Sequence, residues 1–438
     1  MDPTPPAIAR RIPPTRMGAD FHRFWAAGTF TNLGDGLLST ALPLIAATLT
    51  HDPLAVSGLV VARFLPWLVI APFTGVLLDR VDRLRAMFAA NALAATIVAA
   101  LAVTVATSTV TLGVMYAALF AVTCCETVSD PASRIAVTRL VPSRLLDRAN
   151  GRLEGGRLVA QDCVARPVGG ALFAAAAVLP VAGTAVSYAL CAVLTALVVA
   201  SLRRSGAAGQ TGRGGAGRTD PLRGAAAGVG RQLREGFGHV LADPLMRALA
   251  FNNAAMMIGL QMGTAVLVLH VQREWGVGAA YFGLFTASLA VGGILGAVCA
   301  ARFISGIGRR AVLLGGYTCG GSGLALMALL PNAYLGAVVW AVVGLCLALT
   351  NIAGSLLFQT MVPDHLRGRA SAAFRALGWG LAPVGALVGG LLGRVDLSLP
   401  YLVGGLTMVG AAVVFRRALG EFARRSDQAA ADLAATNG

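Results

Sequence analysis

The sequence contains no lysine: all 35 basic residues of the 438-residue chain are arginines. Without lysine there is no Walker A motif and no side-chain amine for a Schiff base, which excludes a P-loop motor and lysine catalysis. Histidine is also scarce, with five residues that form neither an HExxH motif nor a cluster with aspartate. A membrane-embedded enzyme built on histidine chemistry therefore has no support in the sequence.

Charged residues make up only 13% of the chain, whereas soluble domains carry roughly 25%. Hydrophobic residues make up 56%, and the mean hydropathy is +0.73. The seven cysteines lie in apolar stretches and form no CxxC pair or Cys/His cluster, so we expect small buried residues and no metal site. This composition is typical of a membrane protein.

Twelve apolar runs are each close to the roughly 20 residues that a bilayer requires. The sequence therefore predicts an all-α membrane protein with twelve transmembrane helices. The runs are residues 24–48, 56–78, 87–107, 111–129, 158–178, 181–201, 247–271, 280–303, 309–330, 333–358, 372–393 and 399–417.

An internal repeat divides these runs into two sets of six. Residues 141–150 (VPSRLLDRAN) are echoed by 362–371 (VPDHLRGRAS), an offset of 221 because 362 less 141 is 221. The same offset places Phe30-Thr-Asn onto Phe251-Asn-Asn, and Gly75 onto Gly296. Matches at one spacing indicate two duplicated, pseudo-symmetric halves.

The segments outside the apolar runs set the expected domain boundaries. We expect an N-terminal tail (1–23), a first six-helix bundle (24–202), a linker rich in Gly, Ala and Arg (203–245), a second bundle (246–418) and a C-terminal tail (419–438). The end of the last segment is polar and rich in alanine, and we expect it to be disordered.

Arginine placement predicts the orientation. With both termini in the cytoplasm, 31 of the 35 arginines lie on the cytoplasmic side, as the positive-inside rule requires. These arginines are spread over every cytoplasmic loop and form no single face, which argues against nucleic-acid binding. We expect a multi-pass protein of the cytoplasmic (inner) membrane, a monomer whose partners are the lipid bilayer and a small-molecule substrate.

Residues 75–85 (GVLLDRVDRLR) join the second and third apolar runs. Gly75 allows close helix approach, Asp79 lies at the membrane boundary, and Arg80 and Arg83 hold that boundary in the cytoplasm. The stretch resembles the signature loop of the major facilitator superfamily, Gly-x-x-x-Asp-Arg-x-Gly-Arg-(Arg/Lys). It departs from that pattern at Asp82, where the family has glycine.

The resemblance implies the major facilitator fold, with two six-helix bundles. It also implies that the signature carboxylate, Asp79, acts with an arginine at the end of helix 4 and with the N-terminus of helix 11. Arg134 and the region near Ser371 match these positions. We interpret the three as a cytoplasmic gate latch.

Ionisable residues inside the spans carry most of the functional information, since each costs about 2.5–3.5 kcal/mol at mid-membrane. Asp35 lies near the middle of the first span, in the sequence Asn32-Leu-Gly-Asp-Gly. It is either a packing carboxylate that accepts a hydrogen bond or a site for a proton or cation. We expect Gly34 and Gly36 to leave room for water beside it, and Asn32 to face the same cavity.

The fourth span carries Glu126, Asp130 and Arg134 at intervals of four, so the three share one helix face and Asp130 should pair with Arg134. Arg63 lies in the second span and is assigned no role. The spans of the second half contain no Asp or Glu. Any coupling chemistry therefore belongs to the first half.

The fifth span contains residues 161–170, QDCVARPVGG. Exporters of the superfamily carry Gly-Pro-x-x-Gly-Gly here, and the resemblance implies a hinge at Pro167, Gly169 and Gly170 that lets this helix slide against its counterpart in the other half. Arg166 replaces the first glycine of that pattern. Asp162 and Arg166 lie one turn apart and either neutralise each other or leave Arg166 to bind an acidic group of the substrate.

Further motifs, among them Leu42-Pro-Leu, Leu65-Pro-Trp and Glu126-Thr-Val-Ser-Asp-Pro, are similar to the branch that includes siderophore exporters, macrolide efflux pumps and transmembrane secretion effectors. The resemblance implies a secondary active transporter that exports a small hydrophobic or amphipathic compound, such as a drug, siderophore or secondary metabolite. We expect proton antiport, no cofactor and no enzymatic activity. The alternatives are a metabolite importer or uniporter, a transport-inactive sensor or an embedded enzyme.

Overall fold

A computed structural model describes residues 17–70, 74, 78, 81–204, 238, 240–361 and 378–437, and these are nearly all helical. The α-helices are α1 (Ala19–Leu49), α2 (Pro53–Val69), α4 (Arg83–Ala106), α5 (Leu112–Leu140), α6 (Leu146–Arg157), α7 (Arg166–Ala175), α8 (Val178–Arg204), α10 (Pro244–Arg273), α11 (Ala279–Ile307), α12 (Arg309–Leu326), α13 (Ala333–Met361), α15 (Ala382–Gly393), α16 (Leu399–Val414) and α17 (Arg416–Asn437). A π-helix, Leu158–Ala165, joins α6 to α7, and short 3-10 helices cover Ser143–Leu145 and Met327–Leu329.

Within the described ranges, seven helices are long and apolar enough to cross a membrane: α4, α5, α8, α10, α11, α12 and α13. The number becomes eight if α16 and α17, which meet at a bend of 59°, are counted as one span. The first span, α1, has 31 residues, and its polar residues keep it outside this group. The expected span at 158–178 is helical without a gap from Leu158 to Ala175, its first eight residues as the π-helix and the rest as α7. The count of twelve stays a prediction.

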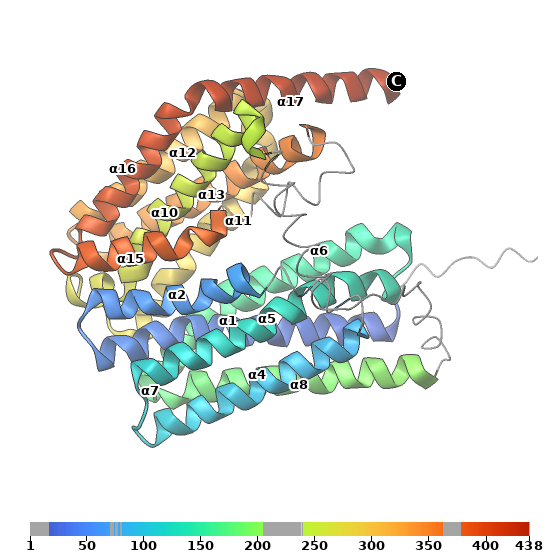
Figure 1. Ribbon diagram of the computed structural model, residues 1–438, viewed down its shortest axis with the longest axis vertical. Coiled ribbons are helices and arrows are strands. Elements are labelled where there is room, and N and C mark those ends of the chain that lie inside the picture. The colour runs from blue at the N-terminus through green and yellow to red at the C-terminus, as the bar shows by residue number, and fades with distance from the viewer. Residues whose placement is uncertain are drawn as a thin grey trace, which may run out of the picture.

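Figure 1 places α1 to α8 in the lower part of the view and α10 to α17 in the upper part. In the lower part α8 packs against α1 and α4, and α5 packs against α2 and α4. In the upper part α11 packs against α13, and α10 and α12 pack against α16. The two largest contacts between the parts are one between α7 and α11 and one between α2 and α15, and smaller ones join α2 and α1 to α10. We call the two largest contacts the seams.

Aspartates are the N-cap residues of three helices. The Asp52 carboxylate accepts a hydrogen bond from the Leu54 amide (3.1 Å), Asp82 from Arg85 (3.0 Å) and Asp243 from Leu245 (2.7 Å). Such N-caps pair amide groups that the first helical turn cannot satisfy. They fix where α2, α4 and α10 begin.

Glycines allow the backbones of α11 and α13 to touch. A Cβ atom at Gly292 would overlap the carbonyl oxygen of Ala341, and one at Gly344 would overlap that of Leu289. The link from α11 to α12 is the single residue Gly308, whose φ of 81° favours glycine. These positions fix the spacing of the second-half helices.

The C-terminal segment differs from the prediction of a disordered tail, because α17 continues to Asn437. Five of the thirteen residues after Arg425 are alanine, the strongest helix former, and the polarity of the segment alone did not indicate a helix. Leu419, Phe422 and Ala423 of α17 are buried in a cluster that includes Val312 of α12 and Leu349 of α13. The first part of α17 is thus docked on the second half.

The α11–α13 contact gives a stability prediction. Gly292→Ala forces the backbones apart and should lower the free energy of unfolding by about 1–3 kcal/mol. The control is Gly315→Ala in α12, where a Cβ would meet nothing within 4 Å. Because alanine is the better helix former, that variant should keep or raise the melting temperature measured in detergent. Equal melting temperatures for the two variants would contradict the contact.

Candidate functional site

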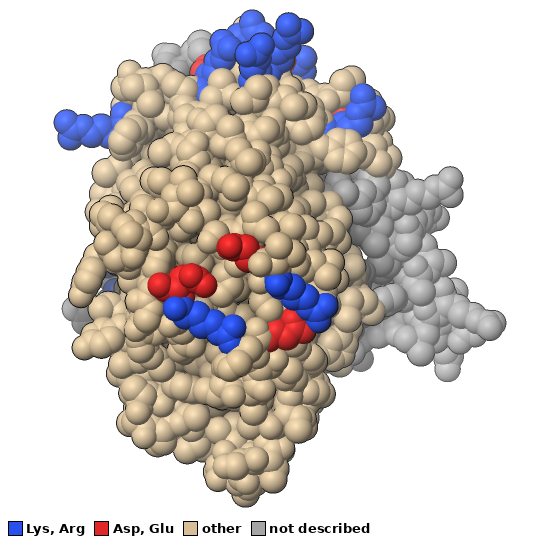
Figure 2. All heavy atoms as spheres, turned by 90° about the vertical axis from the view of Figure 1, so that its left-hand side faces the viewer, with Lys and Arg blue, Asp and Glu red and all other residues tan. Residues whose placement is uncertain are grey.

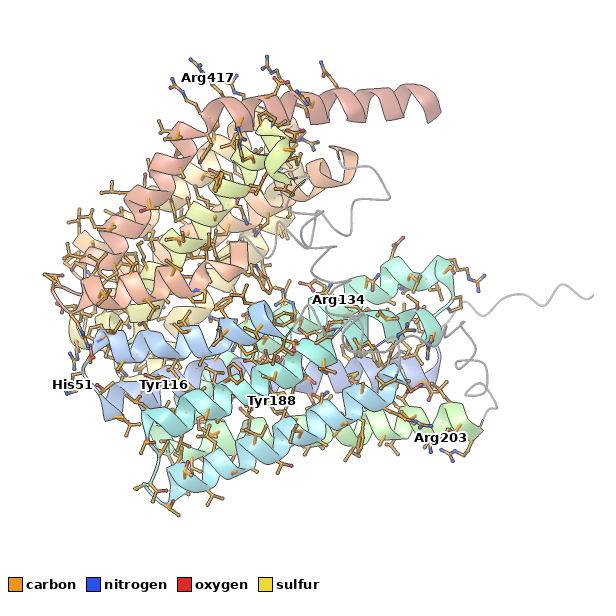
Figure 3. The ribbon with its side chains drawn as sticks, viewed as in Figure 1. His51, Tyr116, Arg134, Tyr188, Arg203 and Arg417 are labelled. Carbon is orange, nitrogen blue, oxygen red and sulfur yellow. The ribbon has the colours of Figure 1, made fainter. Side chains whose placement is uncertain are left out.

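The first-half helices hold a polar site around Asp35 on α1. The hydroxyl of Tyr188, on α8, donates a hydrogen bond to the Asp35 carboxylate, and Tyr188 is buried. Figure 3 shows Tyr188 between His51 at one end of the molecule and Arg203 at the other. We call these the His51 end and the Arg203 end. The Asp35–Tyr188 pair therefore lies well inside the span.

The glycines beside Asp35 serve close packing. A Cβ atom at Gly34 would lie 3.3 Å from the Ser187 Cβ of α8, and one at Gly36 would overlap the carbonyl oxygen of Gln161 in the π-helix. The expected room for water at these two positions is therefore wrong, because neighbouring helices fill it. Gly34 brings α8 close enough for the Tyr188 hydroxyl to reach Asp35.

Three further ionisable side chains lie near this pair. Arg63 on α2 and Glu126 and Asp130 on α5 all interact electrostatically with Asp35. Arg63 and Glu126 are half-buried, and Asp130 is exposed. Among the residues that the structure describes, no ion pair within 4.0 Å joins Arg63 to any of these carboxylates. The site thus holds carboxylates that are not neutralised by direct contact.

The expected pair of Asp130 and Arg134 is not formed as an ion pair within 4.0 Å, although the two interact electrostatically. Helical spacing brings their backbones to one face but does not fix where the long arginine side chain ends. Of the other proposed latch residues, Gly75, Asp79, Arg80 and the region near Ser371 lie outside the described residues. That part of the latch stays a prediction.

The described residues of the signature loop, Asp82 and Arg83, make contacts other than those expected of the latch. Arg83 is the first residue of α4, and its Nε atom is buried with no hydrogen-bond partner among the described residues. Asp82, which stands where the family has glycine, caps α4 and lies 3.8 Å from Arg139 of α5. The departure from the family pattern thus supplies an ion pair between two helices.

Asp162 and Arg166 form the contact expected from their spacing, with 2.9 Å between carboxylate and guanidinium. Asp162 lies in the π-helix and also has Arg157 at 3.9 Å, and Arg157 in turn binds Glu154 at 2.6 Å. The π-helix places residues five apart on one face, which brings Arg157 and Asp162 together. Asp162 is therefore held by two arginines, unlike Asp35.

Gly170, one of the three expected hinge residues, lies where the first half meets the second. A Cβ atom at Gly170 would lie 2.9 Å from the carbonyl oxygens of Ala279 and Ala280 at the beginning of α11, and one at Gly283 would overlap the Arg166 carbonyl. The helix that packs against α7 in the other half is therefore α11, and the expectation of its symmetric counterpart is wrong. The sliding itself stays a prediction.

The remaining hinge residues lie at other contacts. Pro167 is the second residue of α7, immediately after the π-helix. Gly169 instead faces Thr40 and Leu37 of α1, within the first half. The counterpart segment, α15, packs against α2, where a Cβ at Gly390 would lie 2.5 Å from the Ser57 hydroxyl.

Asn32 turns inward on its own helix, because its amide nitrogen donates to the Gly28 carbonyl at 2.6 Å. A different asparagine links the helices: the Asn91 amide of α4 donates to Ser129 on α5 at 2.9 Å, and Thr31 on α1 donates to the Asn91 carbonyl at 3.3 Å. This network lies beside the charged site. Nothing in the sequence indicated this hydrogen-bond network, because its members carry no charge.

Tyr188 and Arg63 also gained no role from the sequence. Tyr188 lies 153 residues from Asp35 in the chain, and no spacing rule connects them. Arg63 was visible as a charge within a span, but its neighbours come from other helices. Only the tertiary contacts identify both.

The His51 end carries an ion pair between the two halves. Arg394, after α15, binds both oxygens of Asp52 at 2.6 and 2.7 Å, and Asp52 also caps α2. Figure 2 shows this face, with a small group of charged side chains in its middle and uncharged surface around them. The hydrogen bonds from Arg394 hold the pKa of Asp52 below its usual range. The pair therefore stays ionised at neutral pH.

A profile described as "Transmembrane secretion effector" matches residues 12–437. The chain belongs to this family of the major facilitator superfamily. The multidrug efflux pump Tap of Mycolicibacterium fortuitum is 31% identical over 28% of this chain and 32% of its own length. The enterobactin exporter EntS of Salmonella typhi is 26% identical over 44% of this chain and 46% of its own. The chain thus spans about a third to a half of these relatives.

Solved structures agree with the fold. A bacterial homologue of the iron transporter ferroportin in its inward-facing state has a TM-score of 0.69 at 16% identity, covering 92% of this chain and 98% of that one. The nucleoside transporter NupG has a TM-score of 0.63 at 14% identity, covering 92% and 99%. Both the family and these structures belong to transporters and not to enzymes.

The Asp52–Arg394 pair gives a prediction about the His51 end. Asp52→Asn keeps a good N-cap but loses the charge, so the two halves should separate more readily there. In a background without the seven native cysteines, Ser57→Cys, at a buried position on α2, should then react faster with an impermeant maleimide added on that side. Asp243→Asn, at another N-cap, is the control and should leave the rate unchanged.

The same pair gives a pH dependence. The pKa of Asp52 is lowered in the folded protein. The stability that its ion pair adds to the contact between the halves is therefore complete above the ordinary carboxyl pKa of about 3.9, and it is lost as the pH falls through the lowered pKa. The thiolate is the species that reacts with maleimide, so the labelling rate of the Ser57→Cys protein is divided at each pH by that of a free thiol such as glutathione. This ratio should be flat near neutral pH. A ratio that rises as the pH falls to about 6 would contradict the ion pair.

Proposed function

We propose that the chain is a secondary active transporter that exports a small hydrophobic or amphipathic compound by alternating access, in exchange for protons. The observation that carries this proposal is the pair of carboxylates at Asp35 and Glu126, which lie half-buried among the helices without a direct ion pair, with the exposed Asp130 near them. A charge held there has a high cost, so it needs a functional reason. Binding a proton, or a cationic part of the substrate, removes that cost.

Proton coupling requires one carboxylate whose affinity for protons differs between the two conformations, since only a differential affinity can shift the equilibrium. Asp35 is the best candidate, because its partner is the neutral Tyr188 hydroxyl and its charged neighbours lie on two other helices. Glu126 is second. Asp162 is third, because Arg166 and Arg157 already compensate its charge.

The proposed architecture is twelve transmembrane helices in two six-helix bundles, residues 24–202 and 246–418, joined by a cytoplasmic linker at 203–245. The internal repeat, the division of helices in Figure 1 and the likeness to transporter structures support this arrangement. The Arg203 end is taken as cytoplasmic because it carries most arginines, and both tails lie on that side. The protein would act as a monomer without a cofactor, driven by the proton gradient.

Export is favoured over import by the names of the curated relatives, an enterobactin exporter and a multidrug efflux pump. Those alignments cover less than half of either relative, so the substrate is proposed only as a class. A metabolite importer or uniporter of the same fold is the alternative, and the coupling experiment below separates it from an antiporter.

Asp35→Asn should abolish uphill export driven by a pH gradient while substrate binding and downhill exchange stay measurable, because the amide keeps the packing but cannot exchange a proton. The measurement is substrate accumulation in inverted membrane vesicles, with and without the gradient. Asp147→Asn, at an exposed aspartate of α6, is the control and should export as the parent does. If Asp35→Asn still concentrates substrate, coupling belongs to Glu126 or the protein is a uniporter.

The orientation is tested with fusions. The linker at 203–245 carries seven arginines and should lie inside, so a reporter inserted there should be active only if it is a cytoplasmic one. A fusion near Asp52 should report the opposite side. Reversed activities would overturn the orientation and, with it, the direction of transport.

A further inference from the structure

Helix α17 leaves the axis of α16 at an angle of 59° and packs across α10, α12 and α13. Its apolar face is buried through Leu419 and Phe422, and Asp427 lies 3.2 Å from Arg309 at the beginning of α12. A Cβ at Gly420 would lie 3.0 Å from the Arg310 guanidinium, so helix and arginine touch. The polar face of α17 is therefore held in a fixed position at the end of the second half.

Four arginines lie on this helix, and they differ in their partners. Arg424 and Arg425 both bind Glu421, at 2.5 and 2.9 Å. Arg416 and Arg417 are exposed, and neither forms an ion pair within 4.0 Å in the part of the chain that the structure describes. Figure 2 shows arginines gathered at the top of the molecule, where Figure 1 places α17. The first turn of α17 thus presents two unpaired cations.

The residues just before Arg416 and Arg417 indicate the surroundings of these two arginines. Val413 and Val414, at the end of α16, are 51% and 72% exposed. Large aliphatic side chains exposed at the end of an apolar helix face lipid chains, and the two arginines follow after a single residue. The cations are therefore at the level where acyl chains end and headgroups begin.

We propose that Arg416 and Arg417 bind the phosphate of an anionic phospholipid. A guanidinium group matches phosphate oxygens in a bidentate geometry, and cations near the surface are attracted to an anionic leaflet. The neighbouring valines select a lipid over free phosphate, because only a lipid brings acyl chains to them. Arg424 and Arg425 are poorer sites, since Glu421 compensates them and they lie about 12 Å farther along the helix.

The test uses the purified full chain in detergent and native mass spectrometry. Dioleoyl-phosphatidylglycerol should bind more tightly than dioleoyl-phosphatidylcholine, which has the same chains and no net charge. Loss of two surface cations in Arg416→Gln/Arg417→Gln should weaken phosphatidylglycerol binding by about tenfold or more. The matched variant Arg424→Gln/Arg425→Gln removes the same charge and should weaken it by less than about threefold.

Arg416→Lys/Arg417→Lys keeps both charges and should therefore retain most of the phosphatidylglycerol binding that the double glutamine variant loses. Circular dichroism and gel filtration check the fold of each variant. Equal loss in the two glutamine variants would overturn the proposal, as would equal binding of the two lipids. Displacement of the lipid by an excess of inorganic phosphate would show a site for free phosphate and would also overturn it.

Discussion

A carboxylate inside a helical membrane domain needs a counter-charge or a hydrogen-bond donor, and much of the first half is arranged around that requirement. The chain meets it in two ways. Asp162 has two arginines on its own helical segment, so its charge is neutralised locally. Asp35 has a neutral tyrosine donor and more distant charges on α2 and α5. The first arrangement is a fixed structural pair, while the second keeps a carboxylate whose charge depends on the positions of three other helices.

The two halves contribute different kinds of residue. The charged site lies in the first half, whereas α10 to α16 contain no Asp or Glu in the described ranges of their helices. The second half instead contributes glycines that let backbones touch, both within it and across the seams. All the carboxylates within the described helices from α1 to α16 therefore come from the first half.

The sequence predicts those features that depend on neighbouring residues. The Asp162–Arg166 contact follows from helical spacing, and the apolar runs mark most helix ends to within a few residues, although α5 continues to Leu140, eleven residues past its run. Features that depend on contacts between distant helices could not be predicted, such as the Tyr188 donor for Asp35. Glycine was ambiguous for the same reason: Gly34 and Gly36 looked like room for water, and only the positions of α8 and the π-helix show that they are filled. The π-helix itself has no sequence signal here, because the same residues satisfy an α-helical pattern.

The seam between α7 and α11 consists largely of glycine Cα groups against carbonyl oxygens that are already hydrogen-bonded within their own helices. Drawing these two helices apart would break no directional bond and would leave no donor or acceptor unpaired. The resistance to separation there comes from dispersion and from the exposure of a narrow apolar strip, both of which change smoothly with distance. The Asp52–Arg394 pair is different, since it is short, bidentate and sensitive to angle. Motion between the halves would thus be smooth along the helices and abrupt at the His51 end, where Asp52 meets Arg394.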